Sequence, residues 1–91
     1  MDNGEDIAKK IEDISKRMEM LINDTSVPKN VRSAINDAKG HLDAKNNETI
    51  VRISSAIYSI DAISNDINLP PQARSAVWNI LSMLESIKVG N

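Results

Sequence analysis

Apolar residues recur at helical spacing in four stretches of the chain, with polar residues between them. An α-helix has about 3.6 residues per turn, so steps of three and four residues place these side chains on one face of each helix. The four predicted core-facing stripes are Ile7, Ile11, Ile14, Met18, Leu21 and Ile22; Val31, Ala34, Ile35, Ala38 and Leu42; Ile50, Ile53, Ile57, Ile60 and Ile63, broadened by Val51, Ala56 and Ala62; and Ala73, Val77, Ile80, Leu84 and Ile87, with Leu81 beside them.

Prolines and a polar cluster predict where three of these helices begin. The second helix should start near Pro28, because proline has no N–H to lose in a first turn. The cluster at residues 46–48, Asn-Asn-Glu, predicts a turn and a cap before the third helix. Pro70 should be extended, since a residue before proline avoids the α region, which makes Pro71 the first residue of the fourth helix.

Glycines suggest where two helices end. Gly40 is either the C-terminal stop of the second helix or a close-packing point within a longer helix. We favour a frayed end between Gly40 and Lys45. Gly90 is expected to end the fourth helix.

An internal repeat organises the chain. Residues 23–35 and 65–77 align at an offset of 42 without a gap, and six of the thirteen positions are identical, which indicates a helical unit used twice. The sequence therefore predicts one all-α domain over residues 1–91. Its expected architecture is an up-and-down four-helix bundle made of two tandem helical hairpins, about 5–45 and 47–89, with internal pseudo-two-fold symmetry.

The identical repeat positions lie at the turn into the second helix of each hairpin, and two interpretations of them stay open. The structural interpretation is that the aspartates accept backbone N–H groups in a turn and the arginines reach back to carboxylates or carbonyls. The alternative is a pair of ligand-binding loops, because arginines near helix N-termini attract anions. The residues concerned are Asp24, Pro28 and Arg32 in the first copy and Asp66, Pro70 and Arg74 in the second.

Composition and motifs exclude several function classes. The net charge of −2 disfavours nucleic acid as a partner, since nucleic-acid modules carry a basic face. His41 is the only histidine and has no Glu-x-x-His context, so no metal or other cofactor is expected and His41 is interpreted as a surface residue. No nucleophile elbow or phosphate loop occurs, and we expect no enzymatic activity.

The expected location is the cytoplasm, with no membrane partner. The chain has no cysteine, which is compatible with a reducing compartment. Its first residues lack the pattern of a secretory signal. No apolar run approaches the roughly 20 residues that cross a bilayer.

Charge is unevenly distributed along the chain, and this suggests a partner surface. Residues 1–46 contain 17 charged side chains, whereas residues 47–91 contain 7. We therefore predict a non-enzymatic protein-interaction or structural module. Self-association is the preferred hypothesis, and another protein is the alternative partner. The candidate interface is Tyr58, Trp78 and Leu81, because tryptophan is enriched at binding hot spots. The alternative is a small-molecule or anion-binding bundle.

Two family resemblances attach to these motifs. Asp24, Pro28 and the Val31-Arg32 pair resemble the turn of HEAT-like helical repeats, which implies helical hairpins and protein binding. Segments 27–34, 52–57 and 71–78, including Trp78, resemble more closely the uncharacterised protein family zero-one-four-seven of archaea. This second resemblance implies an all-helical bundle and an archaeal, cytoplasmic protein. The family has no assigned activity, so no functional residues are carried over.

Overall fold

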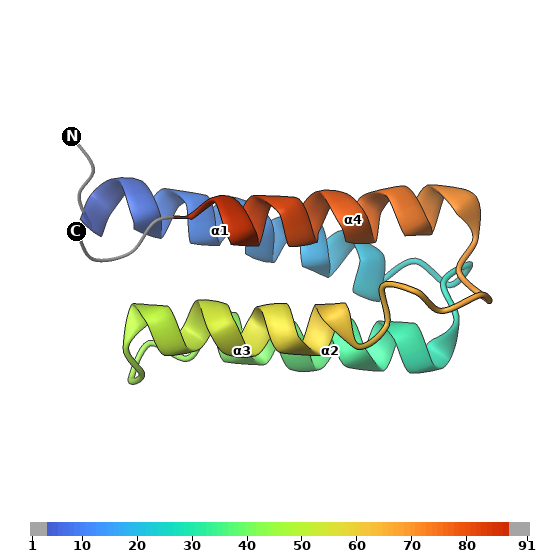
Figure 1. The fold of residues 1–91 in the computed structure, drawn as a ribbon, viewed down its shortest axis with the longest axis horizontal. Helices are drawn as coiled ribbons and strands as arrows, with labels where there is room; N and C mark the ends of the chain where they lie inside the picture. Colours follow the sequence, from blue (N-terminus) through green and yellow to red (C-terminus); the bar gives the residue numbers. More distant parts are fainter. Residues whose placement is uncertain (1–3, 88–91) are drawn as a thin grey trace.

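The computed structural model describes residues 4–87, which form four α-helices and, within that range, no strand. The helices are α1 (Gly4–Ile22), α2 (Lys29–Leu42), α3 (Thr49–Asp61) and α4 (Pro71–Ser86). Figure 1 shows α1 and α4 side by side in one layer and α2 and α3 in the other. Both α1 and α3 pack against α2 and α4, and the most extensive contact joins α2 to α3. The predicted all-α fold is confirmed.

Each of the last three helices begins after an extended residue rather than after a hydrogen-bonding cap. Pro28 (φ −55°, ψ 147°), Glu48 (φ −65°, ψ 146°) and Pro70 (φ −60°, ψ 152°) precede α2, α3 and α4, and none makes a side-chain capping bond. The extended Pro70 followed by a helical Pro71 is as predicted. The fixed φ of proline thus replaces a side-chain cap at two of these starts.

Gly40 is neither the stop of α2 nor a close-packing point, but the helix does end between Gly40 and Lys45, as favoured from the sequence. α2 runs through it to Leu42, and the Asp43 N–H donates to the Lys39 carbonyl at 2.9 Å. Outside its own helical backbone, no atom lies within 4 Å of the point where a Cβ on Gly40 would stand. Gly40 therefore occupies an ordinary, exposed helical position. The end predicted at Gly90 lies outside the described residues, and α4 ends at Ser86.

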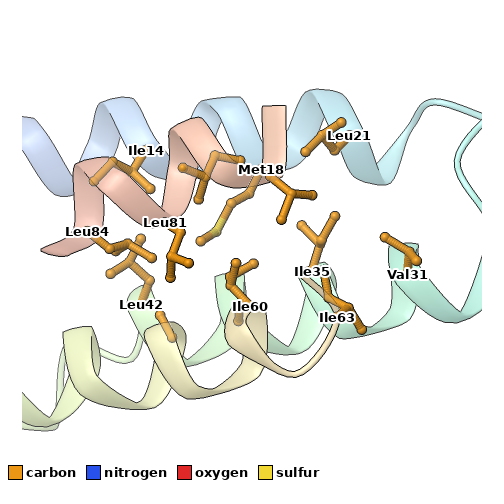
Figure 2. Packing of buried hydrophobic residues seen from close by; sticks show 14 of the residues in the cluster. Ile14, Met18, Leu21, Val31, Ile35, Leu42, Ile60, Ile63, Leu81 and Leu84 are labelled. Carbon is orange, nitrogen blue, oxygen red and sulfur yellow. The ribbon is translucent and has the colours of Figure 1, made fainter. Parts of the chain in front are cut away.

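The core is aliphatic and draws on all four helices, whose apolar faces converge between the two layers (Figure 2). Val27, Ile63 and Leu69, which lie in the loops between helices, are also buried. Most of the predicted stripe residues are in this core. The large side chains that are less than 2% exposed are Ile14, Met18, Val27, Val31, Ile35, Leu42, Ile60, Val77, Ile80 and Leu84.

The third predicted stripe is too broad. Val51 is 45% exposed and Ala62 is exposed, because each lies two residues, or about 200°, from the buried Ile53 or Ile60. Ile50 is 50% exposed and lies in the first turn of α3. The face of α3 that packs inward is therefore narrower than the pattern of isoleucines indicated.

Leu81, by contrast, is more buried than predicted. We expected it in an exposed interface, but it is only 3% exposed and belongs to the core. It lies about 100° around the helix from the buried Ile80. Because α4 packs against both α1 and α3, its buried stripe is wide enough to hold both side chains.

The burial of Ile60 predicts a large loss of stability on truncation. Ile60→Ala should lower the free energy of unfolding by about 2–5 kcal/mol, because it removes apolar contacts and leaves a cavity. Ile67→Ala is the matched control, since Ile67 is 87% exposed and its truncation should change stability by less than about 0.5 kcal/mol. Urea denaturation followed by circular dichroism measures both. A loss below about 1 kcal/mol for Ile60→Ala would place this face of α3 outside the core.

The open surroundings of Gly40 predict a stabilising substitution. Gly40→Ala should raise the free energy of unfolding by about 0.5–1 kcal/mol, because alanine restricts the unfolded chain and fits a helical backbone. A thermal melt compared with wild type provides the measurement. A lower melting temperature would mean that Gly40 is needed for a local packing contact.

Candidate functional site

The exposed apolar side chains concentrate on α3, α4 and the loop between them. Among the described residues, five of the six large apolar side chains that are exposed lie between residues 50 and 78. Tyr58 on α3 is 81% exposed and Trp78 on α4 is 47% exposed. These two predicted interface residues are thus on the surface, on helices that pack against each other. Sequence reasoning missed the others in this group, which are Ile50, Val51 and Ile67.

Ion pairs are distributed in the opposite way. Of the five that join described residues, three lie along α1, one joins α1 to α2, and one joins α2 to Asp43, the residue that follows it. Three of them are i,i+4 pairs along α1, such as Arg17 with Asp13 at 3.5 Å. Within the same part of the chain, no ion pair involves α3 or α4. The helices with exposed apolar residues are therefore also those with the fewest charge contacts.

The two repeat aspartates are turn residues. The Asp24 carboxylate accepts the Ser26 hydroxyl at 2.7 Å and the Ser26 N–H at 2.9 Å, and these bonds lower the pKa of Asp24. Asp66 accepts the Asn68 N–H at 2.8 Å and the Asn30 side-chain amide at 3.1 Å. These bonds, that of the Asn68 N–H most of all, lower the pKa of Asp66. The Asn30 bond ties the start of α2 to the α3–α4 loop.

The repeat arginines bind carbonyls of their own loops. Arg32 Nε donates to the Val27 carbonyl at 3.0 Å, and a terminal nitrogen of Arg74 donates to the Leu69 carbonyl at 3.4 Å. Their positive charges also contribute to lowering the pKa values of Asp24 and Asp66.

The structure reveals a third copy of this loop, which sequence reasoning missed. In all three loops, the residue before the extended N-cap residue donates its N–H to the carbonyl three residues earlier: 27 to 24, 47 to 44 and 69 to 66. An arginine follows four residues after each N-cap, as Arg32, Arg52 and Arg74. Arg52 Nε donates to the Leu42 carbonyl at 2.8 Å. The similar spacing of the three arginines, 20 and then 22 residues, was the available signal.

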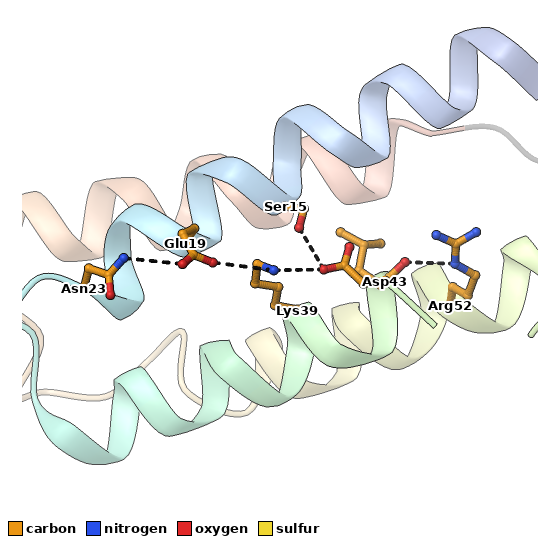
Figure 3. Close-up of polar contacts among 7 residues, drawn as sticks. Ser15, Glu19, Asn23, Lys39, Asp43 and Arg52 are labelled. Atoms are coloured by element: carbon orange, nitrogen blue, oxygen red, sulfur yellow. Dashed lines mark hydrogen bonds and ion pairs between the residues drawn. The ribbon is translucent and has the colours of Figure 1, made fainter. Parts of the chain in front are cut away.

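A polar seam joins α1 to the end of α2 (Figure 3). Lys39 Nζ bonds Asp43 at 3.0 Å and lies 3.5 Å from the Glu19 carboxylate, and the Asp43 bond is the main reason that the pKa of Lys39 is raised. The same Asp43 oxygen accepts the Ser15 hydroxyl at 3.1 Å, while Glu19 accepts the Asn23 amide at 3.5 Å. Partly exposed pairs such as these stabilise a fold by only about 0–1 kcal/mol each.

Two of the surface clefts are formed between different elements of the described chain. The α1–α4 groove has a volume of about 310 Å³ and is mostly apolar, with Met20 and Ala76 on facing sides. The second, which we call the α2-end cleft, has a volume of about 610 Å³ and lies where α1 passes the α2–α3 loop and the start of α3. It is lined by Ala8, Ile11, Glu12, Ser15, Lys16, Asp43, Lys45 and Arg52.

The described part of the chain has neither a metal-binding cluster nor a membrane-spanning helix. His41 is exposed, as predicted. Among the side chains that the structure describes, no group of three or more histidine, aspartate or glutamate residues is placed to hold a metal ion. None of the four helices is both long and apolar enough to span a bilayer.

The turn bonds of Asp24 predict an acid-dependent contribution to stability. Because the pKa of Asp24 is lower in the folded state than its usual 3.8, its ionised form stabilises the fold above that value. This contribution is lost as the pH falls through the folded-state pKa. We expect Asp24→Asn, which keeps the acceptor but does not titrate, to lose less stability than wild type between about pH 4 and pH 2.

Urea denaturation over that pH range tests the expectation. Asp37→Asn controls for removal of one negative charge, since Asp37 is exposed on α2. If Asp24→Asn and wild type lose stability in parallel, the turn bonds do not favour the ionised carboxylate.

Comparisons with solved structures support the helical arrangement. One crystal structure, of an unknown function protein MMP1188, matches with a TM-score of 0.84 at 43% identity, over 89% of this chain and 92% of that one. A second, of a protein from the uncharacterised family UPF0147 from Thermoplasma acidophilum, has a TM-score of 0.83 at 28% identity, over 89% and 95% of the two chains.

Sequence comparisons identify the family. A UPF0147 protein of Methanocaldococcus jannaschii is 41% identical over 75 residues, which are 82% of this chain and 81% of the relative. A UPF0147 protein of Sulfurisphaera tokodaii is 41% identical over 71 residues, or 78% and 80% of the two chains. Both relatives are archaeal, as the resemblance implied, and the family's function is unknown. The model of the uncharacterised protein family UPF0147 matches residues 1–87, and the chain belongs to this family.

Proposed function

We propose that this protein is a protein-interaction module that associates with a second copy of itself through α3 and α4. The observation that carries the proposal is the concentration of exposed apolar side chains between residues 50 and 78. Tyr58 and Trp78 are the central residues of the proposed contact. Burying such side chains against a partner stabilises an assembly, and tryptophan and tyrosine are enriched at binding hot spots.

The charge distribution favours a second copy as the partner. A two-fold interface brings the same surface of both subunits together, so like charges on it would repel. α3 has only Arg52 and Asp61 as charged residues, and α4 has only Arg74 and Glu85. α1, by contrast, alternates acidic and basic residues along its length. The low-charge helices are therefore the ones suited to contact their own copy.

We further propose that the four helices are an up-and-down four-helix bundle made of two hairpins with pseudo-two-fold symmetry, over a single domain of 1–91. The circular order of contacts supports this arrangement, because each helix packs against both of its neighbours in that order. A HEAT-like array would instead stack hairpins in a row. The matching 24–32 and 66–74 loops support the symmetry.

The proposed role is non-enzymatic and cytoplasmic. The motifs of the sequence include no activated nucleophile and no phosphate loop, and nothing in the family description points to an activity. The absence of cysteine is compatible with a reducing compartment. The repeat arginines support a structural role for the loops rather than a ligand site, since Arg32 and Arg74 donate to loop carbonyls.

Light scattering tests self-association. We expect a dimer that dissociates on dilution, and Trp78→Ala should weaken it by about tenfold or more if Trp78 is a hot spot. Met20→Ala is the matched control, because Met20 is 73% exposed but lies on α1. A wild-type protein that is monomeric up to millimolar concentration would overturn the homodimer, and equal effects of both variants would overturn the chosen face.

A further inference from the structure

We infer that the α2-end cleft is a binding site for a small phosphorylated molecule, held by Arg52 and Lys45. The cleft includes neither Tyr58 nor Trp78, and the inference does not depend on the proposed self-association. The cleft is about 610 Å³ in volume, which is within the usual range for small-molecule sites. Three separate elements supply its cations: α1 contributes Lys16, the α2–α3 loop Lys45 and α3 Arg52.

The charges of the cleft leave two cations without an acidic partner. Its two carboxylates are already engaged, because Glu12 lies 3.8 Å from Lys16 Nζ and Asp43 accepts bonds from Lys39 and Ser15. No carboxylate of the described residues lies within ion-pair distance of Lys45 or Arg52. An anion could therefore bind Lys45 and Arg52 without breaking an existing ion pair.

Arg52 is held in place for such a contact. Its Nε donates to the Leu42 carbonyl at 2.8 Å, which fixes the guanidinium plane at the end of α2. Figure 3 shows its terminal nitrogens on the side of Nε that faces α1, and α1 residues line the same cleft. A guanidinium with free terminal N–H groups matches the oxygens of phosphate in a bidentate geometry. Since the plane is already fixed, less conformational freedom is lost on binding.

Arg52 differs in this respect from the other two loop arginines. Arg32 and Arg74 donate to the residue just before their own N-cap, Val27 or Leu69. Arg52 instead reaches the last residue of the preceding helix, which brings its guanidinium to the cleft. Neither Arg32 nor Arg74 lines this cleft. Arg32 is therefore a matched control, with the same kind of loop bond but no place in the proposed site.

The other walls of the cleft define the class of ligand. Ser15 is only 8% exposed and its hydroxyl donates to Asp43, while Ala8 and Ile11 on α1 contribute apolar surface. A phosphate monoester with a small apolar or polar body matches this combination of cations on one side and aliphatic groups on the other. The volume is larger than a lone phosphate ion needs, so the organic part of the molecule would fill the remainder.

NMR titration with inorganic phosphate and then with phenyl phosphate tests the site, with sodium chloride matched for ionic strength. We expect saturable shifts of the Arg52 Nε–H and of the Lys45 and Ser15 amides, with phenyl phosphate binding more tightly. Arg52→Leu should weaken binding by about tenfold, which is the usual effect of losing a charge-assisted bond. Lys45→Met should weaken it less, and Arg32→Leu and Lys29→Met should leave it unchanged.

Three results would overturn the inference. They are an absence of saturable shifts, equal weakening by Lys45→Met and Lys29→Met, and equal weakening by the Arg52 and Arg32 variants. If Arg52→Leu does not fold, Arg52→Lys keeps the charge but loses the planar fork, and it should bind phosphate more weakly than wild type. Unchanged binding by that variant would also count against the site.

Discussion

Burial of apolar stripes is the interaction on which everything else in this protein depends. α2 and α3 contain 14 and 13 residues, a length at which an isolated helix is at best marginally stable in water. Side-chain caps do not supply the missing stability at α2, α3 or α4, because the N-cap residues make no such bonds. Each helix must therefore be stabilised by its neighbours. Apolar burial is therefore the main source of stability. The turn bonds help to set where the helices begin, and the polar seam helps to position α1 against α2.

Much of the fold follows directly from the sequence, because apolar spacing and proline have local consequences. Met18, Val31 and Val77 are fully buried as their spacing predicts, and the extended Pro70 follows from the proline after it. The sequence-based predictions of burial fail where burial depends on a neighbouring helix. Leu81 is buried because α4 packs against two partners, and the sequence of α4 alone does not reveal how wide its buried face must be.

The candidate sites were less predictable than the core. Tyr58 and Trp78 are exposed, but Ile50 and Val51, which are also exposed, were assigned to the core, and the exposed Ile67 was not singled out. Arg52 was overlooked because the repeat was measured at an offset of 42, which is the sum of two shorter steps of 20 and 22 between Arg32, Arg52 and Arg74. A cleft such as the one beside Arg52 requires three elements to meet in space, which no local pattern encodes.

The helices that follow the three loops differ in which of their sides faces the core. The residue before each loop arginine is Val31, Val51 or Ala73, and the first and last of these are buried, whereas Val51 faces solvent. The first buried residue of α3 is instead Ile53, two places later, so α3 is turned by roughly half a revolution relative to α2 and α4. The position that is buried at the start of α2 and α4 thus faces solvent at the start of α3. Rotation of one repeated helix about its own axis is enough to place an aliphatic side chain on the surface, without any change in residue type.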